Sequence, residues 1–269
     1  MRKYRIGVDL GGTNIVAGVV DDNYKIVATA QVNTNCPRPA EDIVADMAAA
    51  AQRAVENAGL KLSDIEAMGV GTPGAIDPVH GVVCYANNLD FHDVPMAAML
   101  KEKLGVDFYI ENDANAAAYG EYIAGAGKGS NDFIAITLGT GVGGGVIIDG
   151  KIYSGSNYAG AELGHVVINM DGEICTCGRQ GCWEAYASAT ALKRDAKRAT
   201  GRELNPEEIF KEAQEGDEKL LQVVQSYIGK LGTGIINIVN IFRPQLVILG
   251  GGVSAQGETL LEPLREMMK

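Results

Sequence analysis

Long apolar runs are missing from this sequence of 269 residues. A membrane-spanning helix needs roughly 18 to 20 consecutive apolar residues. The chain also starts Met1-Arg2-Lys3-Tyr4-Arg5 and passes into a short strand-like run, without the apolar region of a secretory leader. We therefore expect no membrane association and a cytoplasmic location.

Positive charge is scarce as well. The chain has 23 Lys and Arg residues against 34 Asp and Glu residues, which gives a formal net charge of −11. A surface of this sign repels the phosphates of nucleic acids and the headgroups of anionic lipids. The composition therefore argues against nucleic acid as a partner.

The cysteines do not have the layout of a disulfide framework. There are five, an odd number, and Cys175, Cys177 and Cys182 are crowded together while Cys36 and Cys84 stand far away. A reducing compartment fits this distribution. We assign no role to Cys36 or Cys84.

Glycine, in contrast, is abundant, with 35 residues that cluster at the ends of apolar runs. The runs at 6–13, 134–141 and 246–252 are each predicted to be a buried strand that ends in a tight glycine turn. A further strand-like run follows the first two, so a unit of strand, glycine loop and strand occurs twice. This repeat suggests two lobes, which we place at 1–112 and 113–269.

Helical periodicity alternates with these strands, which predicts an α/β protein. A capping pattern at Asn205, with Pro206 next and Glu208 three residues on, marks one helix start. The predicted helices cover 40–58, 94–104, 114–124, 183–200 and 217–242, with one more starting at Asn205.

The glycine loops at 9–14 and 138–145 are candidates for phosphate binding. Gly139-x-Gly141-x-x-Gly144 matches the dinucleotide fingerprint, but a strand follows it where that motif needs a helix. Two glycine-rich hairpin loops still let backbone N–H groups approach a triphosphate, because glycine has no side chain. Asp9, at the end of the first strand, is suited to hold magnesium through water. The alternative is that the glycines only form turns and Asp9 only caps one.

A metal site is predicted from His165, Cys175, Cys177 and Cys182. One imidazole and three thiolates are the donor set of a closed tetrahedral zinc site, which leaves no position for a reactive water. Free thiols or a redox pair are the alternative. Glu162 and Glu184 flank this segment, and carboxylates accept hydrogen bonds from hydroxyl-rich ligands; in isolation either could be a surface residue.

Asp113 is the candidate catalytic base. It follows an apolar strand just where a helix begins, so its carboxylate either caps that helix or faces a ligand. Phosphoryl transfer to an alcohol uses a carboxylate beside the attacking hydroxyl.

These residues together resemble the ROK group of sugar kinases and repressors, and within it the bacterial-type glucokinases, over almost the whole chain. The resemblance is carried by the segments at 9–14, 71–74, 111–115, 138–145 and 162–184. It implies an actin-like ATPase (ribonuclease H-like) fold of two lobes with ATP and sugar between them, and transfer of the γ-phosphoryl group, with magnesium, to O6 of glucose. It also implies that His165 binds both zinc and sugar, and we expect a homodimer or homotetramer.

The site residues that the resemblance implies fall into four sets. The base is Asp113; the sugar contacts are Gly74, Asn87, Asn112, Glu162, His165 and Glu184; the nucleotide and magnesium contacts are Asp9, Gly11, Gly12, Thr13, Asn14, Gly139, Thr140, Gly141, Gly251 and Gly252; the zinc ligands are His165, Cys175, Cys177 and Cys182.

The C-terminal end of the chain differs from the family pattern, and its start differs from that of the repressors in the family. Members continue for several dozen residues beyond the strand at 246–252, so we expect the helix that completes the first lobe to be missing here. The chain begins at the first phosphate strand, so we expect no DNA-reading helix pair. The alternatives left open are a kinase for N-acetylmannosamine or another hexose, a sugar-sensing repressor, and a non-catalytic sugar binder.

Overall fold

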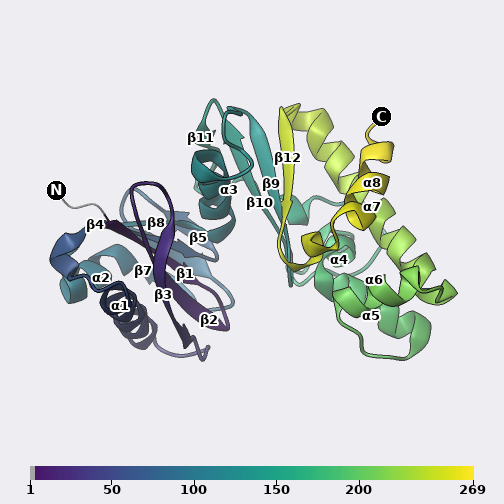
Figure 1. Cartoon of the computed structure of the whole chain (residues 1–269). Coiled ribbons are helices and arrows are strands. Elements are labelled where there is room, and N and C mark those ends of the chain that lie inside the picture. The colour runs from purple at the N-terminus through teal and green to yellow at the C-terminus, as the bar shows by residue number, and fades with distance from the viewer. Residues whose placement is uncertain (1–3) are drawn as a thin grey trace. The chain divides into compact units, whose positions relative to one another are not determined.

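The computed structural model describes residues 4–269, which divide into two compact units (Figure 1). The first contains residues 4–124 and Ser154–Gly160, and the second contains Gly125–Tyr153 and Ala161–Lys269. The helix that follows Asn112 groups with the first unit, whereas our predicted division fell in front of it.

The first unit is built on a five-stranded mixed sheet with the order β3-β2-β1-β4-β8. Strand β1 pairs antiparallel with β2 and parallel with β4, and β4 pairs parallel with β8. The hairpin β1–β2 is the first predicted unit of strand, glycine loop and strand. The strands are β1 Tyr4–Leu10, β2 Asn14–Val20, β3 Ile26–Asn33, β4 Ile65–Thr72 and β8 Phe108–Asn112.

The two faces of this sheet have different partners. Ile6, Val8 and Leu10 of β1 are buried on the face that packs against α1, while Asp9 points to the other face. The remaining elements of this unit are α1 Ala40–Asn57, the 3₁₀ turn η1 Leu62–Asp64, β5 Ala75–Asp77, β6 Val82–Ala86, β7 Phe91–Val94, α2 Met96–Leu104 and α3 Asp113–Ala124.

The second unit repeats the strand, glycine loop and strand pattern in a four-stranded sheet with the order β11-β10-β9-β12. Strand β9 pairs antiparallel with β10 and parallel with β12, so β9 and β12 end at the same edge. The elements are β9 Phe133–Leu138, β10 Val142–Ile148, β11 Lys151–Ile152, η2 Leu163–His165, α4 Glu184–Ala187, α5 Ala189–Thr200, α6 Pro206–Gln214, α7 Glu218–Phe242, β12 Leu246–Gly250, η3 Gly252–Gln256 and α8 Glu258–Met267.

Trp183 anchors the core of the second unit. Its ring is fully buried, and its indole N–H donates to the carbonyl of Lys230 at 3.1 Å. A Cβ at Gly234 would overlap this ring, so α7 can approach it only because position 234 has no side chain. Through Trp183 the segment before α4 is fixed to the longest helix of the unit.

One predicted helix is wrong in its continuity. We expected a single helix over 183–200, but it divides at Ser188, whose backbone is extended (φ −78°, ψ 161°). The Ser188 hydroxyl accepts a hydrogen bond from the N–H of Ala191 at 3.1 Å and so caps α5. A serine inside an apolar periodic run can start a new helix, and periodicity alone does not reveal this.

In the part of the chain that the structure describes, no helix has both the length and the apolar character needed to cross a membrane.

Candidate functional site

In the first unit, the carboxyl ends of three parallel strands meet at one edge of the sheet. Asp9 of β1 lies opposite Gly71 of β4, and Gly71 lies opposite Glu111 of β8. A Cβ at Gly71 would lie 3.6 Å from the Cα of Asp113. The fold therefore gathers the predicted base and the predicted magnesium carboxylate at this edge.

Asn112 caps helix α3. Its Oδ1 accepts hydrogen bonds from the N–H groups of Ala114 and Asn115, at 3.0 and 3.2 Å. Asp113 is the first residue of the helix, and its Oδ1 accepts from Ala114 at 2.8 Å. The neighbouring asparagine thus performs most of the capping that was the alternative role for Asp113.

The carboxyl groups of Asp9 and Asp113 are electrostatically coupled. Desolvation raises the pKa of Asp113 above its usual 3.8, although the residue is exposed to solvent. Desolvation also raises the pKa of Asp9, and the negative charge of Asp113 raises it further. Two neighbouring carboxyl groups with raised pKa values are suited to a divalent cation or to proton transfer.

The predicted sugar contacts of the first unit surround the end of β6. The side-chain amide of Asn112 donates to the carbonyl of Gly74 at 3.2 Å. Gly74 has φ +106°, and a Cβ there would overlap the carbonyl oxygen of Tyr85. Asn87 lies beside Tyr85, whose hydroxyl donates to its Oδ1 at 3.0 Å. Gly74, Asn87 and Asn112 are thus brought into one neighbourhood.

Thr34 holds the glycine loop of the first unit. Its buried hydroxyl donates to the carbonyl of Gly11 at 2.6 Å, and its N–H donates to the carbonyl of Thr13 at 2.8 Å. Within the loop, the Gly11 N–H donates to the carbonyl of Asn14 at 2.9 Å. Sequence reasoning missed Thr34, because nothing in the sequence separates it from an ordinary polar residue after a strand.

The glycine loop of the second unit is held by the start of α5. Ala189 donates its N–H to the carbonyl of Gly139 at 2.8 Å, and the Thr190 hydroxyl donates to the carbonyl of Thr140 at 2.7 Å. The Gly139 N–H donates across the loop to the carbonyl of Gly141 at 3.0 Å. Sequence analysis singled out neither Ala189 nor Thr190, because it placed both in the middle of one helix.

Gly251 brings the third glycine segment beside this loop. It follows β12 with φ +83°, and a Cβ there would lie within 2.6–2.8 Å of the backbone of Leu138. Gly252 then begins η3. The predicted nucleotide contacts Gly139, Gly251 and Gly252 therefore lie at the shared edge of β9 and β12.

The four predicted zinc ligands converge in the second unit. Their ligand atoms all lie within 4.8 Å of one another, with 3.7 Å between Cys175 Sγ and His165 Nδ1 and 3.6 Å between Cys177 Sγ and Cys182 Sγ. A tetrahedral zinc ion with Zn–S about 2.3 Å and Zn–N about 2.0 Å places its ligands roughly 3.5–3.8 Å apart. The donor set and its spacing both fit zinc.

A tight hairpin makes this convergence possible, and we call residues 165–182 the knot segment. The N–H of Gly178 donates to the carbonyl of Cys175 at 2.9 Å, and Gly178 and Gly181 have φ +84° and +80°. Desolvation raises the pKa of the Cys175 thiol and raises that of Cys182 to about 12. A bound cation would have to displace these thiol protons.

Glu184 joins the knot segment to the glycine loop. Its Oε1 accepts from the Thr176 hydroxyl at 3.2 Å, and its Oε2 accepts from the N–H of Val142 at 3.0 Å. A Cβ at Gly141 would overlap the same carboxylate. Glu162 caps the 3₁₀ turn that ends at His165, whose N–H donates to the carbonyl of Glu162 at 3.1 Å. Glu162 and His165 therefore share one turn, and Glu184 lies beside the zinc-ligand candidates, with its Oε1 3.5 Å from Cys175 Sγ.

Comparison with known proteins finds a family model and several sugar kinases to which this chain is similar. The model of the ROK family matches residues 5–269. A glucokinase of Thermotoga maritima is 37% identical, with 97% of this chain and 86% of that protein covered. A glucokinase of Streptomyces coelicolor is 38% identical, with 98% and 86% covered.

Solved structures give the same result. A ROK family glucokinase from Streptomyces griseus, in complex with glucose and AMPPNP, superimposes with a TM-score of 0.85 at 39% identity, covering 98% of this chain and 88% of that one. The likeness confirms the predicted α/β, actin-like ATPase fold.

Proposed function

Because this chain belongs to the ROK family, we propose that it is an ATP-dependent glucokinase, which transfers the γ-phosphoryl group of ATP to O6 of glucose. The observation that carries this function is the placement of Asp113 beside Asp9 at the carboxyl edge of β1, β4 and β8, with Asn112 as the helix cap. Curated glucokinases similar over nearly the full chain support the same reaction.

We assign the role of general base to Asp113. As O6 of the sugar bonds to the γ-phosphorus, its proton passes to the Asp113 carboxylate, and the bond from the γ-phosphorus to the bridging oxygen breaks to release ADP. Desolvation favours this role, since a carboxyl with a raised pKa is a better proton acceptor than an ordinary aspartate. Asp9 is assigned to the magnesium that accompanies ATP.

We assign phosphate binding to the glycine segments. The N–H groups of Gly11 and Gly139 close the turns, and the glycine positions without side chains let the other backbone N–H groups of the loops approach phosphate oxygens. The proposed contacts are Gly11, Gly12, Thr13 and Asn14 in the first unit, and Gly139, Thr140, Gly141, Gly251 and Gly252 in the second.

Sugar recognition is assigned to amide, carboxylate and imidazole groups. They are Gly74, Asn87 and Asn112 in the first unit and Glu162, His165 and Glu184 in the second. His165 Nδ1 faces Cys175, which makes Nε2 the nitrogen for a sugar hydroxyl.

The knot segment would hold one zinc ion through His165, Cys175, Cys177 and Cys182. The metal would fix the loop and take no part in the reaction, because four protein ligands fill a tetrahedral site. We further propose a cytoplasmic glycolytic enzyme that assembles as a homodimer or homotetramer. The free cysteines of the described chain support a reducing compartment.

A coupled assay of ATP-dependent phosphorylation across hexoses tests this function. We expect glucose to give a higher kcat/KM than fructose, mannose or N-acetylmannosamine. A strong preference for one of the other sugars would overturn the assignment of glucose and retain a sugar kinase. Sugar binding without any ATP-dependent turnover would instead favour a non-catalytic binder.

A further inference from the structure

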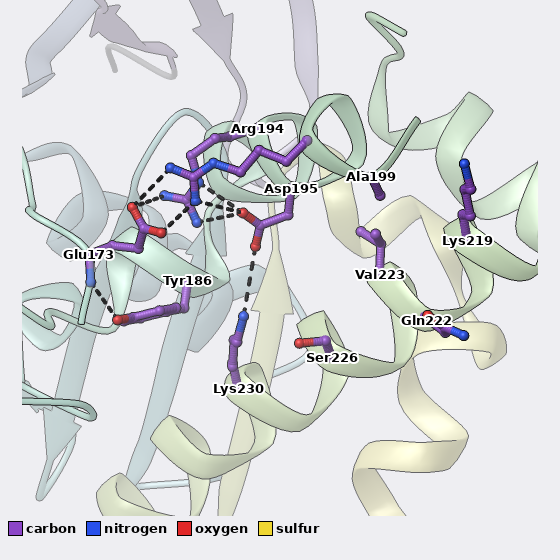
Figure 2. Close-up of a pocket in the computed structure, with 11 residues that line it drawn as sticks. Glu173, Tyr186, Arg194, Asp195, Ala199, Lys219, Gln222, Val223, Ser226 and Lys230 are labelled. Atoms are coloured by element: carbon purple, nitrogen blue, oxygen red, sulfur yellow. Dashed lines mark hydrogen bonds and ion pairs between the residues drawn. The ribbon is translucent and has the colours of Figure 1, made fainter. Parts of the chain in front are cut away.

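A cavity of ≈ 600 Å³ lies in the second unit, between α5, α7 and the knot segment (Figure 2). Its volume is in the range of small-molecule sites. The residues that line it include none of those assigned above to sugar, nucleotide or zinc. The cavity is therefore a separate feature of the unit.

The lining of this cavity is cationic in an acidic protein. Arg194, Arg198, Lys219 and Lys230 contribute four positive charges, and Glu173 and Asp195 contribute two negative ones. The surplus is two positive charges, whereas the whole chain has a formal net charge of −11. Such a local reversal of sign concentrates anions at the cavity.

The two arginines are oriented before any ligand arrives. Arg194 Nε donates to Asp195 Oδ1 at 2.9 Å, and its Nη1 donates to the carbonyl of Ala185 at 2.9 Å. Arg198 donates to both oxygens of Glu173, at 2.5 and 3.3 Å. Figure 2 shows Arg194 grouped with Glu173 and Asp195 at one end of the set of lining residues. Because guanidinium groups match the geometry of phosphate oxygens, this orientation lowers the entropic cost of binding an anion.

The face of α7 supplies further donors. Lys219 lies in the first turn of this helix, where the helix dipole also favours an anion, and no ion pair of Lys219 occurs among residues 4–269. Gln222 and Ser226 follow on the same face, then Lys230, which lies 3.7 Å from Asp195 Oδ2 (Figure 2). The neutral amide and hydroxyl groups are suited to the hydroxyls of a sugar.

We propose that this cavity binds a phosphate dianion, either free phosphate or the phosphate group of a sugar phosphate. A dianion balances the surplus of two charges, and Arg198 of α5 and Lys219 of α7 both line the cavity. The alternative is that the basic residues only form ion pairs with Glu173 and Asp195. The cluster would then be a structural link between the knot segment and the two helices. Binding measurements separate these roles, because only the first predicts saturable uptake of an anion.

The test is titration calorimetry of the full chain with inorganic phosphate and, separately, with glucose 6-phosphate. Saturating glucose is present to occupy the proposed sugar contacts, and ATP is absent. The cavity variants are Lys219→Gln and Arg198→Gln. The matched control is Lys193→Gln, which removes an exposed charge from α5 outside the cavity.

We expect saturable binding that weakens about tenfold in each cavity variant and stays within about twofold in the control, since a charge-assisted hydrogen bond is lost only in the former. Melting temperatures report whether each variant is folded. Tighter binding of glucose 6-phosphate identifies a sugar phosphate as the ligand, and equal binding identifies free phosphate. Absence of saturable binding, or equal affinity in all four proteins, overturns the proposal. This experiment measures binding and no turnover, so its result does not test the proposed kinase reaction. The coupled hexose assay tests that reaction separately.

Discussion

At the scale of single residues, Asn112 and Asp113 show how adjacent polar residues divide their tasks. The sequence allowed Asp113 to be either a helix cap or a base. In the structure Asn112 Oδ1 accepts from the N–H groups of both Ala114 and Asn115, whereas Asp113 Oδ1 shares only the Ala114 N–H, and desolvation raises the pKa of Asp113. Asp113 is therefore positioned for chemistry, and its role as the base stays a prediction.

Gly74 is a position where a single methyl group should be costly. Its φ of +106° disfavours any other residue, and a Cβ would overlap the carbonyl of Tyr85. We expect Gly74→Ala to lower the free energy of unfolding by at least about 2 kcal/mol, measured by urea denaturation. Gly69→Ala on strand β4 is the control, because its Cβ would meet no atom within 4 Å, and it should shift stability by less than about 1 kcal/mol. Equal losses in the two variants would contradict this account.

Asp9 should lower stability at neutral pH. Its pKa is raised above 3.8 in the folded state, so the native protein binds more protons than the unfolded chain just above that pH, and stability falls as the pH rises through this window. Asp9→Asn should therefore be more stable than the wild type at pH 7, and this gain should vanish as the pH approaches 3.8.

Asp21 provides a comparison, because its pKa is shifted in the opposite direction to that of Asp9. Backbone hydrogen bonds, the larger from Lys25 and another from Asn23, lower the pKa of its carboxyl. Its stabilising effect is present above 3.8 and is lost as the pH falls below it. Asp21→Asn should thus be less stable than the wild type at pH 7. Thermal unfolding of both variants between about pH 3 and 8 measures this, and a loss of stability in Asp9→Asn at pH 7 would refute the raised pKa of Asp9.

At the scale of elements, the knot segment is the part whose stability should depend on a metal. Cys177 is exposed, so replacing its thiol disturbs little packing but removes one of four ligands. We expect Cys177→Ser to retain less than one zinc ion per chain, to melt at a lower temperature, and to have a higher KM for glucose. Elemental analysis, thermal unfolding and kinetics measure these effects.

The control for this variant is Cys84→Ser, which alters a half-buried thiol of the first unit. It should keep full zinc occupancy. Full occupancy in Cys177→Ser as well would show that the cluster does not hold the metal in the proposed way.

The sequence predicted where a helix begins wherever it contained a recognisable capping pattern. The pattern at Asn205 forms the predicted capping box, with Asn205 Oδ1 accepting from Glu208 N–H and Glu208 Oε2 accepting from Asn205 N–H. Asp217 caps the long helix α7 that was predicted over 217–242. Ser188 lacked such a signal, because its capping bond depends on a break in a run that is periodic on both sides.

At the scale of the whole molecule, the repeat of strand, glycine loop and strand was sufficient to predict two units of α/β structure. Residues with distinctive chemistry, such as the knot cysteines, were predicted by type and spacing. Thr34 and the cationic cavity were not, because each joins segments far apart in sequence: Thr34 contacts a loop more than twenty residues away, and Glu173 contacts α5. Long-range contacts of ordinary residues leave no local pattern.

The central claim is that this sugar kinase uses Asp113 as the base, and Asp113→Asn tests it most directly. Asp42→Asn, in the first turn of α1, is the control, because it removes an exposed carboxylate from a similar helical position. We predict that Asp113→Asn lowers kcat for glucose by about 10²- to 10⁴-fold, as loss of a general base does, while calorimetry finds the dissociation constant for glucose unchanged and Asp42→Asn retains full activity. Wild-type turnover by Asp113→Asn would contradict the account.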